Sequence, residues 1–286
     1  MEWLLSQFVY FVLYSFLGWL CETIYCSIGS KKFINRGFLN GPFCPIYGTG
    51  ALLVIDVFMK YKDDLVALFI LSMVVTSVVE YITSYLLEKI FNLQLWDYST
   101  YSFNLNGRVC LKNSLMFGVL SIAAVEVIHP AVESFLNKLP YWFLVTFTGI
   151  LVVYFICDVF ITVKALLQIN MKAGHRQMQL DELAKLRNEY MAKNKKEDNK
   201  KESKMLQLIK EGKIRELLNE EKIKAFITED KLKELLDVPN KAIHRRVIKA
   251  FPGMKSKKYP DAIKQFKREI NEFKNNRSWR LTRNLV

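Results

Sequence analysis

Five apolar segments, each close to the length that crosses a bilayer, dominate the first 170 residues of this 286-residue chain. A transmembrane helix needs ~20 consecutive, mostly apolar residues. Five such runs in succession leave no amphipathic faces, so buried helices of a water-soluble core are the weaker interpretation. We therefore predict an all-α polytopic membrane protein with about five transmembrane helices. The expected spans cover residues 3–28, 42–59, 64–90, 111–136 and 141–168.

The charge of the chain changes at about residue 170. Residues 1–169 contain 10 Lys/Arg and 11 Asp/Glu, whereas residues 170–286 contain 31 and 17. Each part must be interpreted separately. The first is predicted to be the transmembrane domain, and the second a basic, helical cytoplasmic tail. Within the tail, helical spacing is expected at 180–191, 205–218, 220–226, 230–236, 240–250 and 260–273, with a charged linker at 194–204.

One motif occurs twice, 66 positions apart, at the end of an expected helix each time. It reads aromatic-Leu-x-Glu-x-Ile-aromatic and is followed, 18 residues after the Glu, by the Asn of Leu-Asn-Gly-x-x-Cys. The first copy contains Glu22 and Asn40, and the second contains Glu88 and Asn106. We interpret this as an internal two-helix repeat, with a site expected where the copies meet. The copies cover about residues 3–59 and 64–136, and the fifth helix, 141–168, stands outside them.

Lys and Arg near the helix ends indicate the orientation. No Lys or Arg precedes the first helix, whereas the loop after it carries three and the tail is strongly basic. We predict a multi-pass cell-membrane protein with its N-terminus outside and with both motif loops and the tail in the cytoplasm. The loops are rich in Gly, Asn and aromatic residues, and their Asn-Gly pairs favour left-handed turns. We expect them to fold back into the cytoplasmic mouth of the bundle; plain interfacial connectors are the alternative.

Acidic residues inside the membrane half need cations or hydrogen bonds to remain ionised. Arg36 and Arg108 are the available partners from the loops, since Arg binds carboxylate through two hydrogen bonds. Buried Glu–Arg pairs that pin the loops to the helices are one interpretation, and a substrate or proton path is the other. Two further acids, Glu126 and Asp158, lie within the fourth and fifth spans. The candidates for a substrate or proton path are Glu22, Arg36, Asn40, Glu80, Glu88, Asp97, Asn106 and Arg108.

Enzyme signatures are mostly absent from the sequence. It has no G-x-S-x-G elbow and no H-E-x-x-H pair, and its three histidines are scattered. We therefore predict no catalytic residue, no metal site and no cofactor. A membrane enzyme acting on a lipid-linked or phosphate-bearing substrate remains an alternative, because carboxylates and arginines at an interface suit phosphate head groups. A scaffold that recruits partners through its basic tail is a third. The tail is expected to contact anionic lipid head groups rather than nucleic acid.

Residues 33–48 read FINRGFLNGPFCPIYG, and a second stretch combines Trp96-Asp97-Tyr98-Ser99 with residues 104–108, Asn-Leu-Asn-Gly-Arg. These stretches resemble the putative ABC-transporter permease (type IV) family of Firmicutes membrane proteins. The resemblance implies a bacterial transport protein, and the most favoured function is a permease-like subunit of unknown substrate. The chain contains no G-x-x-x-x-G-K-[ST] phosphate-binding loop. A permease of this kind therefore requires a separate ATPase subunit.

Overall fold

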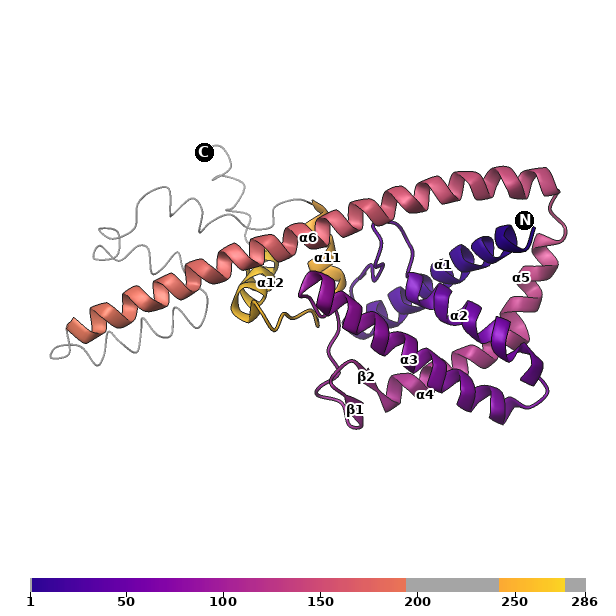
Figure 1. Cartoon of the computed structure of the whole chain (residues 1–286), viewed down its shortest axis with the longest axis horizontal. Coiled ribbons are helices and arrows are strands. Elements are labelled where there is room, and N and C mark those ends of the chain that lie inside the picture. Colours follow the sequence, from indigo (N-terminus) through magenta and orange to yellow (C-terminus); the bar gives the residue numbers. More distant parts are fainter. Residues whose placement is uncertain (1, 194–241, 276–286) are drawn as a thin grey trace. The chain divides into compact units, whose positions relative to one another are not determined.

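The computed structural model describes residues 2–193 and 242–275, and most of them are helical. The chain divides into two compact units, residues 1–167 with 246–255 and residues 168–245 with 256–286, and each is described by itself. Figure 1 shows the order of the elements along the chain. The elements are α1 (Glu2–Ser30), α2 (Pro45–Phe58), η1 (Met59–Tyr61), α3 (Leu65–Phe91), β1 (Asn104–Leu105), β2 (Val109–Cys110), α4 (Leu111–Ala123), η2 (Ala124–Ile128), α5 (His129–Leu136), α6 (Tyr141–Lys193), α11 (Ala242–Ala250) and α12 (Pro260–Asn275).

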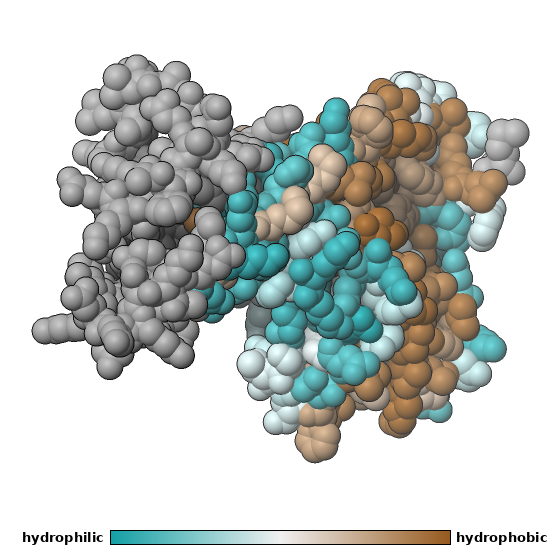
Figure 2. Space-filling view, turned by 60° about the vertical axis from the view of Figure 1, so that its left-hand side comes forward, coloured by the Kyte–Doolittle hydropathy of each residue, from teal (hydrophilic) through white to brown (hydrophobic). Residues whose placement is uncertain are grey.

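Four helices among the described residues are long and apolar enough to cross a membrane. They are α1, α3, the continuous stretch α4–η2–α5, and the first part of α6. Most of their apolar side chains face outward, which suits lipid rather than water as the surrounding medium. Figure 2 shows these side chains gathered in one broad region of the surface. The predicted class, an all-α polytopic membrane protein, is confirmed.

The second expected span, 42–59, differs from the prediction. Residues 42–44 remain in the loop, and the helix α2 begins only at Pro45, where the missing amide hydrogen of proline costs nothing. Its 14 residues rise about 21 Å, short of the ~30 Å hydrocarbon core. The apolar composition of 42–59 did not reveal the boundary between loop and helix. In the part of the chain that the structure describes, four helices thus have spanning length, and α2 is a shorter apolar helix.

The first unit has an apolar core in which α2 and α3 meet α1 and η2. Its buried members include Tyr14, Val54, Leu68 and Val125. At the edge of this core the Tyr14 hydroxyl and His129 Nδ1 form a buried hydrogen bond of 2.7 Å. His129 is therefore a packed residue at the start of α5, and the bond joins α1 to α5.

The second unit combines the later part of α6 with α12. Arg176 of α6 lies 3.6 Å from a carboxylate oxygen of Glu269, and its guanidinium lies 5.7 Å from the ring centre of Phe266. The helices expected at 180–191 and 260–273 are present as parts of α6 and α12, and the helix expected at 240–250 is described from Ala242 onward as α11. Those expected at 205–218, 220–226 and 230–236, and the linker at 194–204, lie outside the described residues.

Candidate functional site

The first motif loop, residues 31–44, folds back along the helices. The Cys44 amide donates to the carbonyl of Ser15, halfway along α1, at 3.0 Å. At the tip of the loop, the amides of Asn40 and Gly41 donate to the two carboxylate oxygens of Asp158, each at 2.8 Å. Asp158 is only 4% exposed and lies in the apolar part of α6. The first loop therefore folds back among the helices, and two amides satisfy the buried carboxylate at its tip.

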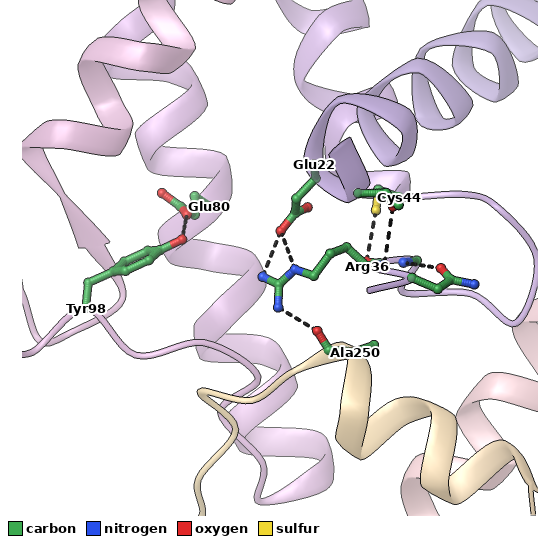
Figure 3. A network of polar contacts seen from close by, with 9 residues as sticks. Glu22, Arg36, Cys44, Glu80, Tyr98 and Ala250 are labelled. Atoms are coloured by element: carbon green, nitrogen blue, oxygen red, sulfur yellow. Dashed lines mark hydrogen bonds and ion pairs between the residues drawn. The ribbon is translucent and has the colours of Figure 1, made fainter. Parts of the chain in front are cut away.

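Glu22 and Arg36 form the first of the two expected pairs. Arg36 Nε and Nη2 both donate to Glu22 Oε1, at 3.0 and 2.8 Å. The third nitrogen, Nη1, donates to the carbonyl of Ala250 at 2.5 Å, as Figure 3 shows. Burial opposes the charge of Arg36, but the Glu22 carboxylate outweighs it and raises the pKa of the guanidinium. The pair joins the end of α1 to the loop that follows it.

Glu88 and Arg108 form the second pair. Arg108 Nη2 donates to Glu88 Oε2 at 2.5 Å, and Nη1 donates to the Tyr81 hydroxyl at 3.2 Å. The guanidinium also lies 5.2 Å from the ring centres of both Tyr81 and Tyr85. Hydrogen bonding to Glu88 raises the pKa of Arg108 above its ordinary value. This pair fastens the second loop, residues 92–110, to α3.

Unlike Glu22 and Glu88, Glu80 has no arginine partner among the described residues. It lies on α3, two turns before Glu88, and is only 4% exposed. The Tyr98 hydroxyl donates to its Oε1 at 3.2 Å, whereas Oε2 has no hydrogen-bond partner among the described residues. Burial, and then the charges of Glu80 and Glu22, raise the pKa of Tyr98, so the phenol keeps its proton and remains a donor. Figure 3 shows Glu80 and Tyr98 in the same region as Glu22 and Arg36.

Asp97 pairs with a lysine rather than with Arg36 or Arg108, the partners expected from the sequence. Lys255 Nζ lies 2.7 Å from its Oδ2, and Ser99 donates to it from both its amide and its hydroxyl. Burial would raise the pKa of Asp97, but the hydrogen bonds from Lys255 and Ser99 outweigh it and lower the pKa. Asp97 thus binds the segment after α11 rather than facing the membrane acids.

The two motif asparagines lie in loops whose backbone conformations differ. Asn106 and Gly107 have φ of 55° and 67°, so the left-handed turn predicted for this pair is confirmed, and it joins β1 to β2. Asn40 and Gly41, which precede Pro42, form no such turn, because neither has a positive φ. Their amides instead turn toward Asp158. Both asparagine side chains are exposed, so the structure does not bring them to the buried acids.

The sequence did not single out several residues that complete this region. Tyr98 donates a hydrogen bond to Glu80, and Arg246 and Lys255 contact the loops from the C-terminal part. The sequence places Asp158 within an apolar run, and this lone carboxylate is the signal that could have indicated its role as an acceptor for the loop amides. Nothing in the local sequence indicated the contacts of Arg246 and Lys255, because their partners lie far away along the chain.

A protein family described as "Putative ABC-transporter type IV" matches residues 9–163. The chain belongs to this family. The match covers both motif loops and every candidate residue predicted from the sequence, and it ends before α11. No curated protein and no solved structure matches the chain with significance.

Proposed function

We propose that this protein is the membrane-embedded permease subunit of an ABC transporter, and that Glu80 and Tyr98 lie on its substrate path. The observation that carries the proposal is the half-satisfied carboxylate of Glu80, buried on α3 in a transporter-family chain. A buried ionisable group in a membrane helix is costly to retain and is therefore a functional candidate. Its second oxygen, Oε2, remains available for a hydrogen bond beside the Tyr98 hydroxyl, whose proton is already donated to Oε1.

The two Glu–Arg pairs have a structural role in this proposal. Arg36 donates three hydrogen bonds, two of them to Glu22, and Arg108 donates one to Glu88 and one to Tyr81, so both charges are neutralised in place. The pairs hold the loops against α1 and α3, while Glu80 stays without a cation. Of the two interpretations of the acids, the geometry therefore supports pinning for Glu22 and Glu88 and the path for Glu80.

The proposal includes an internal repeat, whose two copies contain corresponding contacts. In both copies the motif Glu pairs with an Arg of the following loop, and the motif Cys is buried at the start of the next helix. The correspondence is unequal, because Arg36 follows its Glu by 14 residues and Arg108 follows by 20. The site is accordingly asymmetric, with the acceptor Glu80 belonging to the second copy alone.

The orientation completes the proposal. Both motif loops and the C-terminal part lie in the cytoplasm, with the N-terminus outside the cell membrane of a bacterium. This arrangement places the loops within reach of a separate ATPase, which the chain needs because its sequence has no phosphate-binding loop. The basic tail is suited to contact with anionic lipid head groups at the same surface.

Purification of the tagged protein from its native membranes in mild detergent tests the proposal. We expect a protein with a phosphate-binding loop to co-purify in comparable amount, together with vanadate-sensitive ATP hydrolysis. Replacement of the phosphate-binding Lys in that partner should abolish the activity and leave the complex intact. The proposal is wrong if the purified material contains no such partner and hydrolyses no more ATP than an unrelated membrane protein purified in parallel.

A membrane scaffold is the second candidate, and the closed geometry of both Glu–Arg pairs is the observation that favours it. In a scaffold, the paired charges would serve only to hold the loops. The enzyme alternative receives no such support, since Arg36 and Arg108 are already engaged by carboxylates and are not free for a phosphate group. Co-purification without ATP hydrolysis would favour the scaffold.

A further inference from the structure

A ten-residue segment near the C-terminus, residues 246–255, contacts both motif loops; we call it the clasp. It belongs to the same compact unit as the loops although the rest of the C-terminal part does not. It consists of the last turns of α11 and the loop that follows. Val247, Ile248 and Met254 within it are buried, so the clasp is docked at a defined place.

The clasp holds the first loop through two arginines that point in opposite directions. Arg246 donates from Nη1 to the carbonyl of Gly37 at 3.1 Å and from Nη2 to that of Phe38 at 3.4 Å. In return, Arg36 of the loop donates to the carbonyl of Ala250, and its guanidinium lies 5.3 Å from the ring centre of Phe251. Arg36 therefore joins α1, the first loop and the clasp at one point, as Figure 3 shows.

The clasp holds the second loop through a short backbone pairing. Gln94 and Lys255 exchange two amide-to-carbonyl hydrogen bonds of 2.8 Å, as adjacent antiparallel strands do. Lys255 also forms the ion pair with Asp97. Between these contacts and Arg246, the clasp passes over Trp96: a Cβ added to Gly253 would lie 3.6 Å from the Trp96 Cα.

We propose that the clasp is a reversible lock that keeps the two loops together, and that it must be released for the loops to separate. One segment bonded to both loops prevents them from moving independently. The contact with the second loop consists of a partly exposed ion pair and one backbone pair, and such contacts are individually weak. The clasp is thus held in a specific geometry, and breaking its contacts with the second loop costs little free energy. Its role in opening a substrate path rests on the proposed transporter function.

Accessibility of Cys44 tests the lock directly. This thiol is 3% exposed and donates to the Arg36 carbonyl at 3.4 Å, and burial raises its pKa to about 12. The locked protein therefore presents very little thiolate to a maleimide. The other four cysteines would be replaced by Ala, and labelling would be measured in inside-out vesicles with a membrane-impermeant maleimide. The replaced cysteines are Cys21, Cys26, Cys110 and Cys157.

Lys255→Glu places a negative charge beside Asp97, and Lys249→Glu makes the same charge change at an exposed position of α11. In the contacts described above, Lys255 bonds to the second loop. Labelling of Cys44, in contrast, measures the exposure of the first loop. If the clasp locks both loops, Lys255→Glu should raise the Cys44 labelling rate about threefold to tenfold, and Lys249→Glu should leave it unchanged. Equal labelling in both folded variants would overturn the lock.

A cysteine pair provides an independent measurement if Lys255→Glu does not fold. Trp96→Cys with Gly253→Cys in a cysteine-free chain should close on mild oxidation, and peptide mapping detects the bond. With the ATPase partner present, closure should lower ATP hydrolysis about fivefold, and reduction should restore it. Failure of the pair to close, or an unchanged rate after closure, contradicts the lock. Thiol labelling needs no ATPase, so it still decides about the clasp if the proposed function fails.

Discussion

At the scale of single residues, Glu80 and Tyr98 are the pair on which the proposed path depends. Replacing Glu80 by Gln keeps the size and one acceptor oxygen but removes the ionisable carboxyl group. We expect Glu80→Gln to leave the ATPase complex intact and to reduce its vanadate-sensitive activity about tenfold or more, since Gln cannot take up or release a proton. Glu126→Gln is the control, because Glu126 is an exposed acid on the fourth span. Equal activity of the two variants would exclude Glu80 from the path.

The partly buried ion pair of Glu88 and Arg108 makes a prediction about stability. Arg108→Gln removes the arginine that pairs with Glu88, and because the pair is only partly buried we expect a cost below the ~3–5 kcal/mol of a fully buried pair. The double variant Glu88→Gln with Arg108→Gln should cost less than Arg108→Gln alone. Thermal unfolding of the purified variants in detergent measures both. Additive losses would show that the two side chains act independently.

Gly41 is required by close approach rather than by backbone freedom. A Cβ at this position would lie 2.3 Å from the Tyr154 hydroxyl and 2.9 Å from Asp158 Oδ2. Gly41→Ala must therefore displace the loop tip from α6, at a cost of about 1–3 kcal/mol. Gly149→Ala is the matched control on α6, where an added Cβ meets nothing within 4 Å. The thermal midpoint should fall for the first variant only; an equal midpoint for both would mean that the loop tip lies elsewhere.

At the scale of elements, Asp158 holds the first loop folded back against α6. Its two oxygens accept from successive amides of the loop, so Asp158→Asn leaves one amide without its acceptor. Hydrogen exchange over residues 37–44 should accelerate about tenfold in this variant, with exchange in α3 unchanged. Glu126→Gln, on another helix, should leave the loop protected. Unaltered protection in Asp158→Asn would place the anchor of the loop elsewhere.

The elements also show which features the sequence predicts and why others escape it. Apolar runs of spanning length predict the long helices because burial in lipid has a direct compositional signature. The pairing of Glu22 with Arg36 follows from a charge that needs a nearby partner. Composition failed at α2, where an apolar loop and an apolar helix look alike. It also failed for the clasp, because Arg36 and Ala250 are 214 positions apart and no local pattern joins them.

At the scale of the whole molecule, the proposal requires both motif loops to lie on the side where ATP is available. The charge distribution favours this orientation, mainly through the basic tail. The clasp contacts both loops, which agrees with a placement of both on one side of the membrane. An ATPase in the cytoplasm can act on them only if that side is the cytoplasmic one.

Cysteine labelling at position 106 tests this requirement most directly. Asn106 is exposed at the turn between β1 and β2, so a thiol there is open to reagent from its own side. In a chain without other cysteines, Asn106→Cys should react with a membrane-impermeant maleimide in inside-out vesicles and stay unlabelled in intact cells. Labelling in intact cells would place the loops outside and contradict coupling to a cytoplasmic ATPase.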